Sequence, residues 1–96
     1  MIESFADKTT EDIFNGVDTK QARKIPSKLH EKVQTQLDSI NSAKVVKDLK
    51  IPAGNNLRPM KGERSEEWHI DVNDQYRIYF KFINGNAHDV RVGDDH

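Results

Sequence analysis

The sequence predicts an α+β fold in which a mostly antiparallel sheet of four to five strands packs on two N-terminal helices. One observation is that residues 66–92 alternate between apolar and polar side chains in three consecutive segments separated by turn residues. Another is the spacing of Leu29, Val33, Leu37 and Ile40, which recur every three or four residues as on one face of a helix. A sheet and a helix with one apolar face each bury those faces against one another.

The first quarter of the chain predicts a short strand, a short helix and a polar connection. Residues 2–5 are strand-like, and either Asp7 or Thr9 suits the N-cap of a helix that follows them. Gly16 is typical of a position that ends a helix in the left-handed conformation. Residues 17–24 are almost entirely polar, so we expect them to connect this helix to the next element.

The middle of the chain predicts one long helix followed by loops and an edge strand. The long helix is expected at residues 26–42, where a proline suits the first turn. Turn residues at 51–56 indicate a loop. Residues 57–60 are expected to form a short strand at the edge of the sheet. Pro59 has no amide hydrogen to donate to a neighbouring strand, so a central position is unsuitable. Residues 61–65 are a charged turn.

Three strands are expected in the last third of the chain, at residues 66–72, 75–82 and 86–92. The pairs Asn73-Asp74 and Asn84-Gly85 favour tight hairpin turns between these strands. Alternation places the following residues on the face that the helix covers: Trp68, Ile70, Ile78, Phe80, Phe82, Val90 and Val92. His88 alternates in step with Val90 and Val92. The open face then carries His69, Arg77, Tyr79, Lys81, Asp89 and Arg91.

Composition limits what the chain can be. Its 96 residues suffice for one hydrophobic core, so we expect a single domain at 1–96. The absence of cysteine excludes disulfides, thiolate zinc sites and cysteine nucleophiles. No apolar run approaches the roughly 20 residues that cross a bilayer, and no signal peptide precedes the fold, so a cytoplasmic protein is expected. A net charge of −1 argues against strong nonspecific binding of nucleic acid, although a local basic site is compatible with it.

Basic side chains of the last third indicate a phosphate site. Guanidinium and ammonium groups that converge hold phosphate oxygens in charge-assisted hydrogen bonds. The candidates are Lys61, Arg64, Arg77 and Arg91. The alternative is a solvated face with surface ion pairs, such as Arg91 with Asp71 or Asp89.

The end of the chain offers a proton-transfer group. His96 follows Asp95, and an imidazole titrates near neutral pH, so it suits general acid or base chemistry. The alternative is a frayed terminus. A metal site built from His69 and Asp71 with 94–96 is less favoured, because the spacing matches no tight ligand motif. The chain has no Gly-rich phosphate loop, serine elbow or HExxH motif.

Several segments together resemble a known family. They are MIESF at 1–5, LRPMKGER at 57–64, WHI at 68–70, VNDQYRI at 72–78 and DDH at 94–96. This order and spacing is similar to the HigB branch of the RelE/ParE toxin superfamily, whose members read close to LHPLKGDR, WSI, VNxxWRI and a final DYH. The resemblance covers essentially the whole chain and implies a RelE-like fold.

The resemblance implies the toxin of a type II toxin–antitoxin system, a ribosome-dependent and metal-independent mRNA endonuclease without a cofactor. It implies three kinds of partner: a HigA-like helix-turn-helix antitoxin, the ribosome with its mRNA, and DNA only through the antitoxin. By motif, the catalytic residues are Lys61, Arg77, Asp94 and His96. The substrate-binding residues are Arg58, Arg64 and Arg91. In this scheme Lys61 and Arg77 stabilise charge on the phosphate, His96 transfers a proton, and Asp94 orients the imidazole.

Two positions depart from the family pattern. Arg58 stands where many members have histidine, and Asp95 stands where they have tyrosine. Aspartate does not stack on a base and repels phosphate, so the substitution at 95 keeps a second hypothesis open. In that hypothesis the chain is a catalytically weakened homologue that binds antitoxin and modulates operator repression. A ParE-like gyrase poison is a third, less favoured hypothesis.

Overall fold

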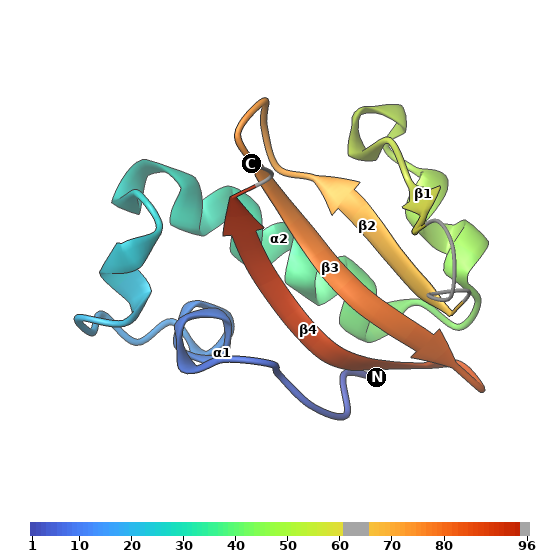
Figure 1. Ribbon diagram of the computed structural model, residues 1–96, viewed down its shortest axis with the longest axis horizontal. Helices are drawn as coiled ribbons and strands as arrows, with labels where there is room; N and C mark the ends of the chain where they lie inside the picture. Colours follow the sequence, from blue (N-terminus) through green and yellow to red (C-terminus); the bar gives the residue numbers. More distant parts are fainter. Residues whose placement is uncertain (61–65, 95–96) are drawn as a thin grey trace.

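The computed structural model describes residues 1–60 and 66–94 and confirms the α+β class. Two α-helices of this part of the chain, α1 (Lys8–Asn15) and α2 (His30–Ser42), accompany a four-stranded antiparallel sheet. The strands follow one another in the order β1 (Arg58–Pro59), β2 (Glu67–Asp71), β3 (Tyr76–Ile83) and β4 (Asn86–Asp94). Helix α2 crosses behind the sheet, and α1 lies beside β4, so one face of the sheet remains open (Figure 1).

Helix α1 begins after Asp7 rather than at Thr9. The Asp7 carboxylate accepts a hydrogen bond from the Thr10 amide at 2.8 Å, which satisfies a free donor of the first turn. Thr9 is instead buried inside the helix and donates its hydroxyl to the Gln21 carbonyl. As predicted, Gly16 ends the helix with a positive φ of 71°.

The long helix is shorter than predicted. Residues Ser27–Leu29 form a 3₁₀ turn, and α-helical geometry begins only at His30. The Leu29 amide donates to the carbonyl of Pro26, three residues earlier, so the first turn is wound more tightly than an α-helix. Helix α2 has 13 residues, and no helix in 1–60 or 66–94 is long and apolar enough to cross a membrane.

Short 3₁₀ turns also occupy segments that the sequence indicated as connections or loops. They are Ala22–Lys24, Val46–Lys50 and Ala53–Asn55. The Asp48 carboxylate accepts hydrogen bonds from the amides of Lys44 and Val45, so this side chain caps the start of the turn at Val46–Lys50.

The predicted strand at residues 2–5 is an irregular extended segment. Ile2 and Phe5 form isolated parallel bridges with Ala87 and Val90 of β4. Between these bridges the amide of Asp89 donates to the Ser4 hydroxyl, so a side chain interrupts the backbone ladder. The segment still covers the outer edge of β4, which leaves fewer unpaired backbone groups there.

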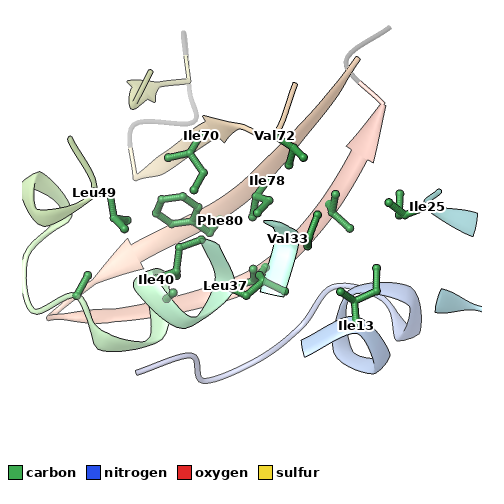
Figure 2. Packing of buried hydrophobic residues seen from close by; sticks show 14 of the residues in the cluster. Ile13, Ile25, Val33, Leu37, Ile40, Leu49, Ile70, Val72, Ile78 and Phe80 are labelled. Carbon is green, nitrogen blue, oxygen red and sulfur yellow. The ribbon is translucent and has the colours of Figure 1, made fainter. Parts of the chain in front are cut away.

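The core lies between α2 and the covered face of the sheet. Val33, Leu37 and Ile40 of the helix have no exposed surface, and Figure 2 shows them packed against the sheet side chains. The buried side chains of the strands include Ile70, Ile78, Phe80, Val90 and Val92, and Val72, just after β2, is buried with them. Burial of each large aliphatic side chain contributes about 1.5–3 kcal/mol, so this layer fixes which face of the sheet remains open.

A β-bulge in β4 reverses the predicted orientation of His88. Tyr79 pairs with Arg91 whereas Lys81 pairs with His88, so β4 has one more residue than β3 across this stretch. Asp89 is the residue with unusual geometry, with φ at 53°. An extra residue inverts the alternation beyond it, which places Ala87 in the core and His88 on the open face. The prediction that His88 shares the face of Val90 is therefore wrong.

The hairpin turns lie where the sequence predicted them. Asn84 and Gly85 both have positive φ, as a tight turn between β3 and β4 requires. The other turn is held by the Asn73 side chain, whose oxygen accepts hydrogen bonds from the amides of Gln75 and Tyr76. Together these turns align three strands whose open-face residues form the surface described next.

Candidate active site on the open face of the sheet

Opposed residues of β1, β2 and β3 build a depression on the open face. His69 pairs with both Arg58 and Tyr79, and Asp71 pairs with Arg77. Directly opposed side chains of antiparallel strands point to the same face and lie about 5 Å apart. The resulting depression has a volume of about 710 Å³ and is lined by Arg58, Pro59, Met60, His69, Asp71, Arg77 and Tyr79. We call it the central depression.

Arg77 is anchored in the central depression by an ion pair. Its Nε atom lies 3.1 Å from Oδ1 of Asp71, and Asn56 donates to the other carboxylate oxygen, also at 3.1 Å. Both side chains of the pair are about one-third exposed or less. A guanidinium held on its Nε side keeps a fixed direction, which is what a group that stabilises charge on a phosphate needs.

The ion pairs on this face differ from those considered in the sequence. Asp71 pairs with Arg77, and Asp89 lies 3.5 Å from the Nζ atom of Lys81. The alternative in which Arg91 pairs with one of these two carboxylates is therefore wrong. Within the described ranges, neither Arg58 nor Arg91 lies within 4.0 Å of a carboxylate. Their charge is available to a ligand.

Arg91 stacks on Tyr79 instead. Its guanidinium carbon lies 4.3 Å from the centroid of the Tyr79 ring, a cation–π contact. Gly93 leaves room for this side chain, because a Cβ atom at that position would lie 2.6 Å from Nη1 of Arg91. Gly93 is opposite Arg77 in the sheet register, so the two arginines occupy neighbouring parts of the open face.

His69 and Tyr79 belong to the site, although the sequence indicated Tyr79 only as a residue of the polar face and His69 as a residue of that face or a metal ligand. His69 is 6% exposed, and its ring centroid lies 5.9 Å from that of Tyr79. The alternation of side chains along the strands, which placed both residues on the open face, was the sequence feature that could have identified them as site residues. The two residues lie opposite one another because of the register of β2 and β3. This register places Tyr79 among the arginines of the open face.

Four of the residues singled out in the sequence, with the predicted turn at 61–65, lie outside the described residues. They are Lys61, Arg64, Asp95 and His96. Of the rest, Arg58 and Arg77 line the central depression, and Arg91 reaches its border through Tyr79. The structure therefore brings three of the predicted arginines onto one face.

Asp94 lies on the other side of β4. It pairs with Tyr76, one residue away from the pair formed by Gly93 and Arg77, and successive residues of a strand point to opposite faces. Its Oδ2 atom accepts a hydrogen bond from the Gln75 side chain at 3.1 Å. The structure thus does not place Asp94 in the central depression with Arg77.

In the described part of the chain, no three His, Asp or Glu side chains gather closely enough to hold a metal ion. The metal site considered in the sequence also relied on Asp95 and His96, which lie outside that part. The arrangement that the described residues do offer is one for binding an anion beside an aromatic ring.

Comparison with known proteins identifies the family. A family model described as the RelE-like toxin of type II toxin–antitoxin system HigB matches residues 3–96. The chain belongs to this HigB-like toxin family. Type II toxins act in pairs with an antitoxin, so membership implies an antitoxin partner.

Curated relatives agree with this assignment. Toxin HigB-1 from Vibrio cholerae serotype O1 is 33% identical over 87 residues, which cover 91% of this HigB-like chain and 90% of the relative. Endoribonuclease HigB from Proteus vulgaris is 31% identical over 96 residues, and the alignment covers 100% of both chains. The resemblance drawn from the motifs is confirmed.

Solved structures confirm the RelE-like fold of the HigB-like chain. The crystal structure of YafQ from E. coli strain BL21(DE3) superposes with a TM-score of 0.57 and covers 99% of this chain and 94% of its own. The two sequences are only 16% identical, so this likeness concerns the fold.

Proposed function

We propose that this HigB-like chain is an endoribonuclease that cleaves mRNA on the ribosome and thereby inhibits translation. The observation that carries the proposal is the open-face arrangement of an anchored Arg77 beside Arg58 and the Arg91–Tyr79 stack. Cationic groups next to an aromatic ring suit a phosphate and its neighbouring base. The relative from Proteus vulgaris, named Endoribonuclease HigB, gives independent support.

The proposed reaction is a transesterification within the RNA. The 2′-oxygen loses its proton and forms a bond to the adjacent phosphorus, while the bond from phosphorus to the 5′-oxygen breaks. The departing 5′-oxygen takes up a proton, which leaves a 2′,3′-cyclic phosphate and a 5′-hydroxyl. Negative charge gathers on the phosphate oxygens as the bonds exchange, so fixed positive charge there accelerates the reaction.

The proposed roles combine described residues with those given by motif. Arg77 and Lys61 stabilise the charge on the phosphate, and His96 transfers a proton. The substrate-holding residues are Arg58, Arg64 and Arg91. Asp94 would orient the imidazole of His96, two residues later in the sequence, as the family motif implies.

The ribosome has a physical role in this proposal. Asp71 and Asp89 offset the charges of Arg77 and Lys81, and the whole chain has a net charge of −1, so its intrinsic affinity for RNA is weak. Binding of the mRNA by the ribosome supplies the missing positioning. We further propose that the chain acts in the cytoplasm. It does so as a single domain at 1–96 and needs no cofactor. Its regulator is a HigA-like helix-turn-helix antitoxin that carries the toxin to DNA.

Expression of the wild type and of Arg77→Ala in bacteria tests the proposal. We expect the wild type to arrest growth and to produce new 5′ ends in mRNA during translation. Arg77→Ala should lower the cleavage rate by about 100-fold, the usual loss for one electrostatic stabiliser. Arg23→Ala is the matched control, because Arg23 is an exposed arginine that pairs with Asp18 away from the open face. A wild type that cuts no mRNA in a translating extract would refute the nuclease.

A second candidate function follows from Asp95. With an acidic residue where related toxins have tyrosine, the chain would bind antitoxin and modulate operator repression without efficient cleavage. Restoring the tyrosine distinguishes the two candidates, as described in the Discussion.

A further inference from the structure

A second depression adjoins the central one on the open face and shares Tyr79 with it. Its volume is about 360 Å³, and its lining includes Ala6, Glu67, Tyr79, Lys81, Asp89 and Arg91. We propose that this depression binds the nucleobase next to the scissile phosphate and that Asp89 selects bases with an exocyclic amino group. The inference rests on the proposed function for its substrate class, single-stranded RNA.

Tyr79 and Arg91 supply the stacking surface of this base subsite. The Arg91 guanidinium already lies over the Tyr79 ring at 4.3 Å, and the Arg91 side chain is exposed. The outer face of the planar guanidinium is therefore open to a base, with the tyrosine behind it. Stacking of this kind does not depend on base identity, since every base has a π face, and losing it weakens single-strand binding by about tenfold or more.

The charges in the second depression fit a base better than a phosphate. Carboxylates of Glu67 and Asp89 line it together with Lys81 and Arg91. The two carboxylates offset the two cations, so this depression has little net attraction for a phosphate. A carboxylate instead accepts hydrogen bonds from the N–H groups of a base. The central depression, with Arg58 and Arg77, is the better position for the phosphate itself. The two depressions thus separate backbone binding from base binding.

Asp89 lies at the β-bulge of β4 and lines this depression. Its φ of 53° lies in the left-handed region, which is unfavourable for most residues and tolerated by Asp and Asn. Such geometry concentrates at functional sites. The Ser4 hydroxyl accepts a hydrogen bond from the Asp89 amide at 2.9 Å and holds the backbone in place. The Asp89 carboxylate is 56% exposed, and both of its contacts are long, because Ser4 Oγ and Lys81 Nζ each lie 3.5 Å from one of its oxygens. Each oxygen can therefore accept a further hydrogen bond from a ligand.

The chemistry of an acceptor at this position predicts a preference. An ionised aspartate only accepts hydrogen bonds, so it favours adenine, cytosine and guanine, each of which has an exocyclic amino group. Uracil presents carbonyl oxygens in that place and is disfavoured. Replacing Asp89 by Asn keeps tolerance of the left-handed backbone and adds a donor, which suits uracil as well.

The test uses binding of RNA that cannot be cleaved. We would titrate 2′-O-methyl trinucleotides of adenine, cytosine or uracil into the purified chain and follow amide resonances by NMR. We expect the adenine and cytosine trinucleotides to shift the amides of Tyr79, Asp89 and Arg91 and to bind about tenfold more tightly than the uracil trinucleotide. Asp89→Asn should lower that ratio to about twofold or less. Asp38→Asn, on the exposed side of α2, is the matched control and should keep the wild-type ratio.

Equal binding of all three trinucleotides by the wild type, or shifts that spare Tyr79 and Arg91, would overturn the subsite even where mRNA cleavage is observed. A wild type that shows the expected binding preference yet cuts no mRNA would instead refute the nuclease and leave the subsite standing. An Asp89→Asn spectrum that retains the wild-type dispersion establishes that the variant is folded.

Discussion

The Nε atom of Arg77 lies 3.1 Å from the carboxylate of Asp71, its direct partner across β2 and β3. Both side chains project from a regular part of the sheet, so the distance between them is set by strand register rather than by a loop. A pair that is about one-third exposed contributes about 0–1 kcal/mol to folding. Its value to the protein is therefore positional, since it directs the guanidinium into the central depression.

We predict that Asp71→Asn lowers mRNA cleavage by about tenfold while the free energy of unfolding changes by less than about 1 kcal/mol. The amide still accepts one hydrogen bond from Arg77, so the loss is smaller than for Arg77→Ala. Single-turnover cleavage and urea denaturation measure the two effects. Asp18→Asn breaks the exposed pair with Arg23 and should leave cleavage unchanged. Equal cleavage by wild type and Asp71→Asn would show that the pair does not position Arg77.

Gly93→Ala should displace Arg91 from Tyr79. The new Cβ atom would lie 2.6 Å from Nη1, the end of a flexible side chain, so the guanidinium moves and the backbone stays. We expect RNA binding to weaken by about tenfold, the usual effect of losing one stacking partner, with a nearly unchanged melting temperature. Binding isotherms with the 2′-O-methyl adenine trinucleotide measure the loss.

Gly54→Ala is the matched control for this change, because no atom lies within 4 Å of the Cβ it would introduce. A Gly93→Ala variant that binds RNA like the wild type would argue against a role of the stacked arginine. A large fall in melting temperature would mean that the backbone, not Arg91, has moved.

Stability should fall in acid because of Asp12. Hydrogen bonds from Lys8 and Thr19, at 2.6 Å each, hold the pKa of the Asp12 carboxyl below its ordinary value. A pKa lowered by folding stabilises the native state fully above the unfolded carboxyl pKa of about 3.9. That contribution is lost as the pH falls below this value through the lowered pKa of the folded state.

Urea denaturation of the wild type, Asp12→Asn and Thr19→Val at several pH values between 3 and 7 checks this prediction. Asp12→Asn should be less stable near neutral pH and should lose less stability on acidification. Thr19→Val, which removes one of the two hydrogen bonds, should fall between it and the wild type. Parallel pH profiles for wild type and Asp12→Asn would contradict the assignment of the acid dependence to this carboxylate.

Asp95→Tyr separates an active nuclease from a weakened homologue. Tyrosine restores the aromatic residue of the family motif, and stacking of a base on it strengthens single-strand binding by about tenfold. If the native chain is a weak nuclease, the substitution should increase growth arrest and mRNA cleavage. Unchanged, efficient cleavage by both forms would show that aspartate at 95 does not impair activity, and Asp95→Asn is the control for loss of charge alone.

Regular parts of the sheet were predictable from the sequence. Alternation placed Ile70, Ile78 and Phe80 in the core and Arg77 and Tyr79 on the open face, because β2 and β3 pair without interruption. The turn at Asn84 and Gly85 was predictable for a local reason, since these residues tolerate positive φ. Local chemistry and an unbroken register are enough in such segments.

Other features depend on contacts that alternation does not encode. The bulge at Asp89 turned His88 toward the open face, and the only local signal was that aspartate tolerates positive φ. The stack of Arg91 on Tyr79 requires the register of β3 and β4, so pairing with Asp71 or Asp89 seemed equally reasonable. The motif grouped Asp94 with the arginines of the site. In the strand, however, Asp94 comes one residue after Gly93 and therefore points to the opposite face.

The bulge has a consequence for how such toxins diversify. Its left-handed backbone at residue 89 is held from outside the core by Ser4, and the side chain there faces solvent. Because that backbone favours aspartate or asparagine, exchange between these two residues is the variation it tolerates most readily. Descendants of one scaffold can therefore shift their RNA preference by one conservative exchange at the surface.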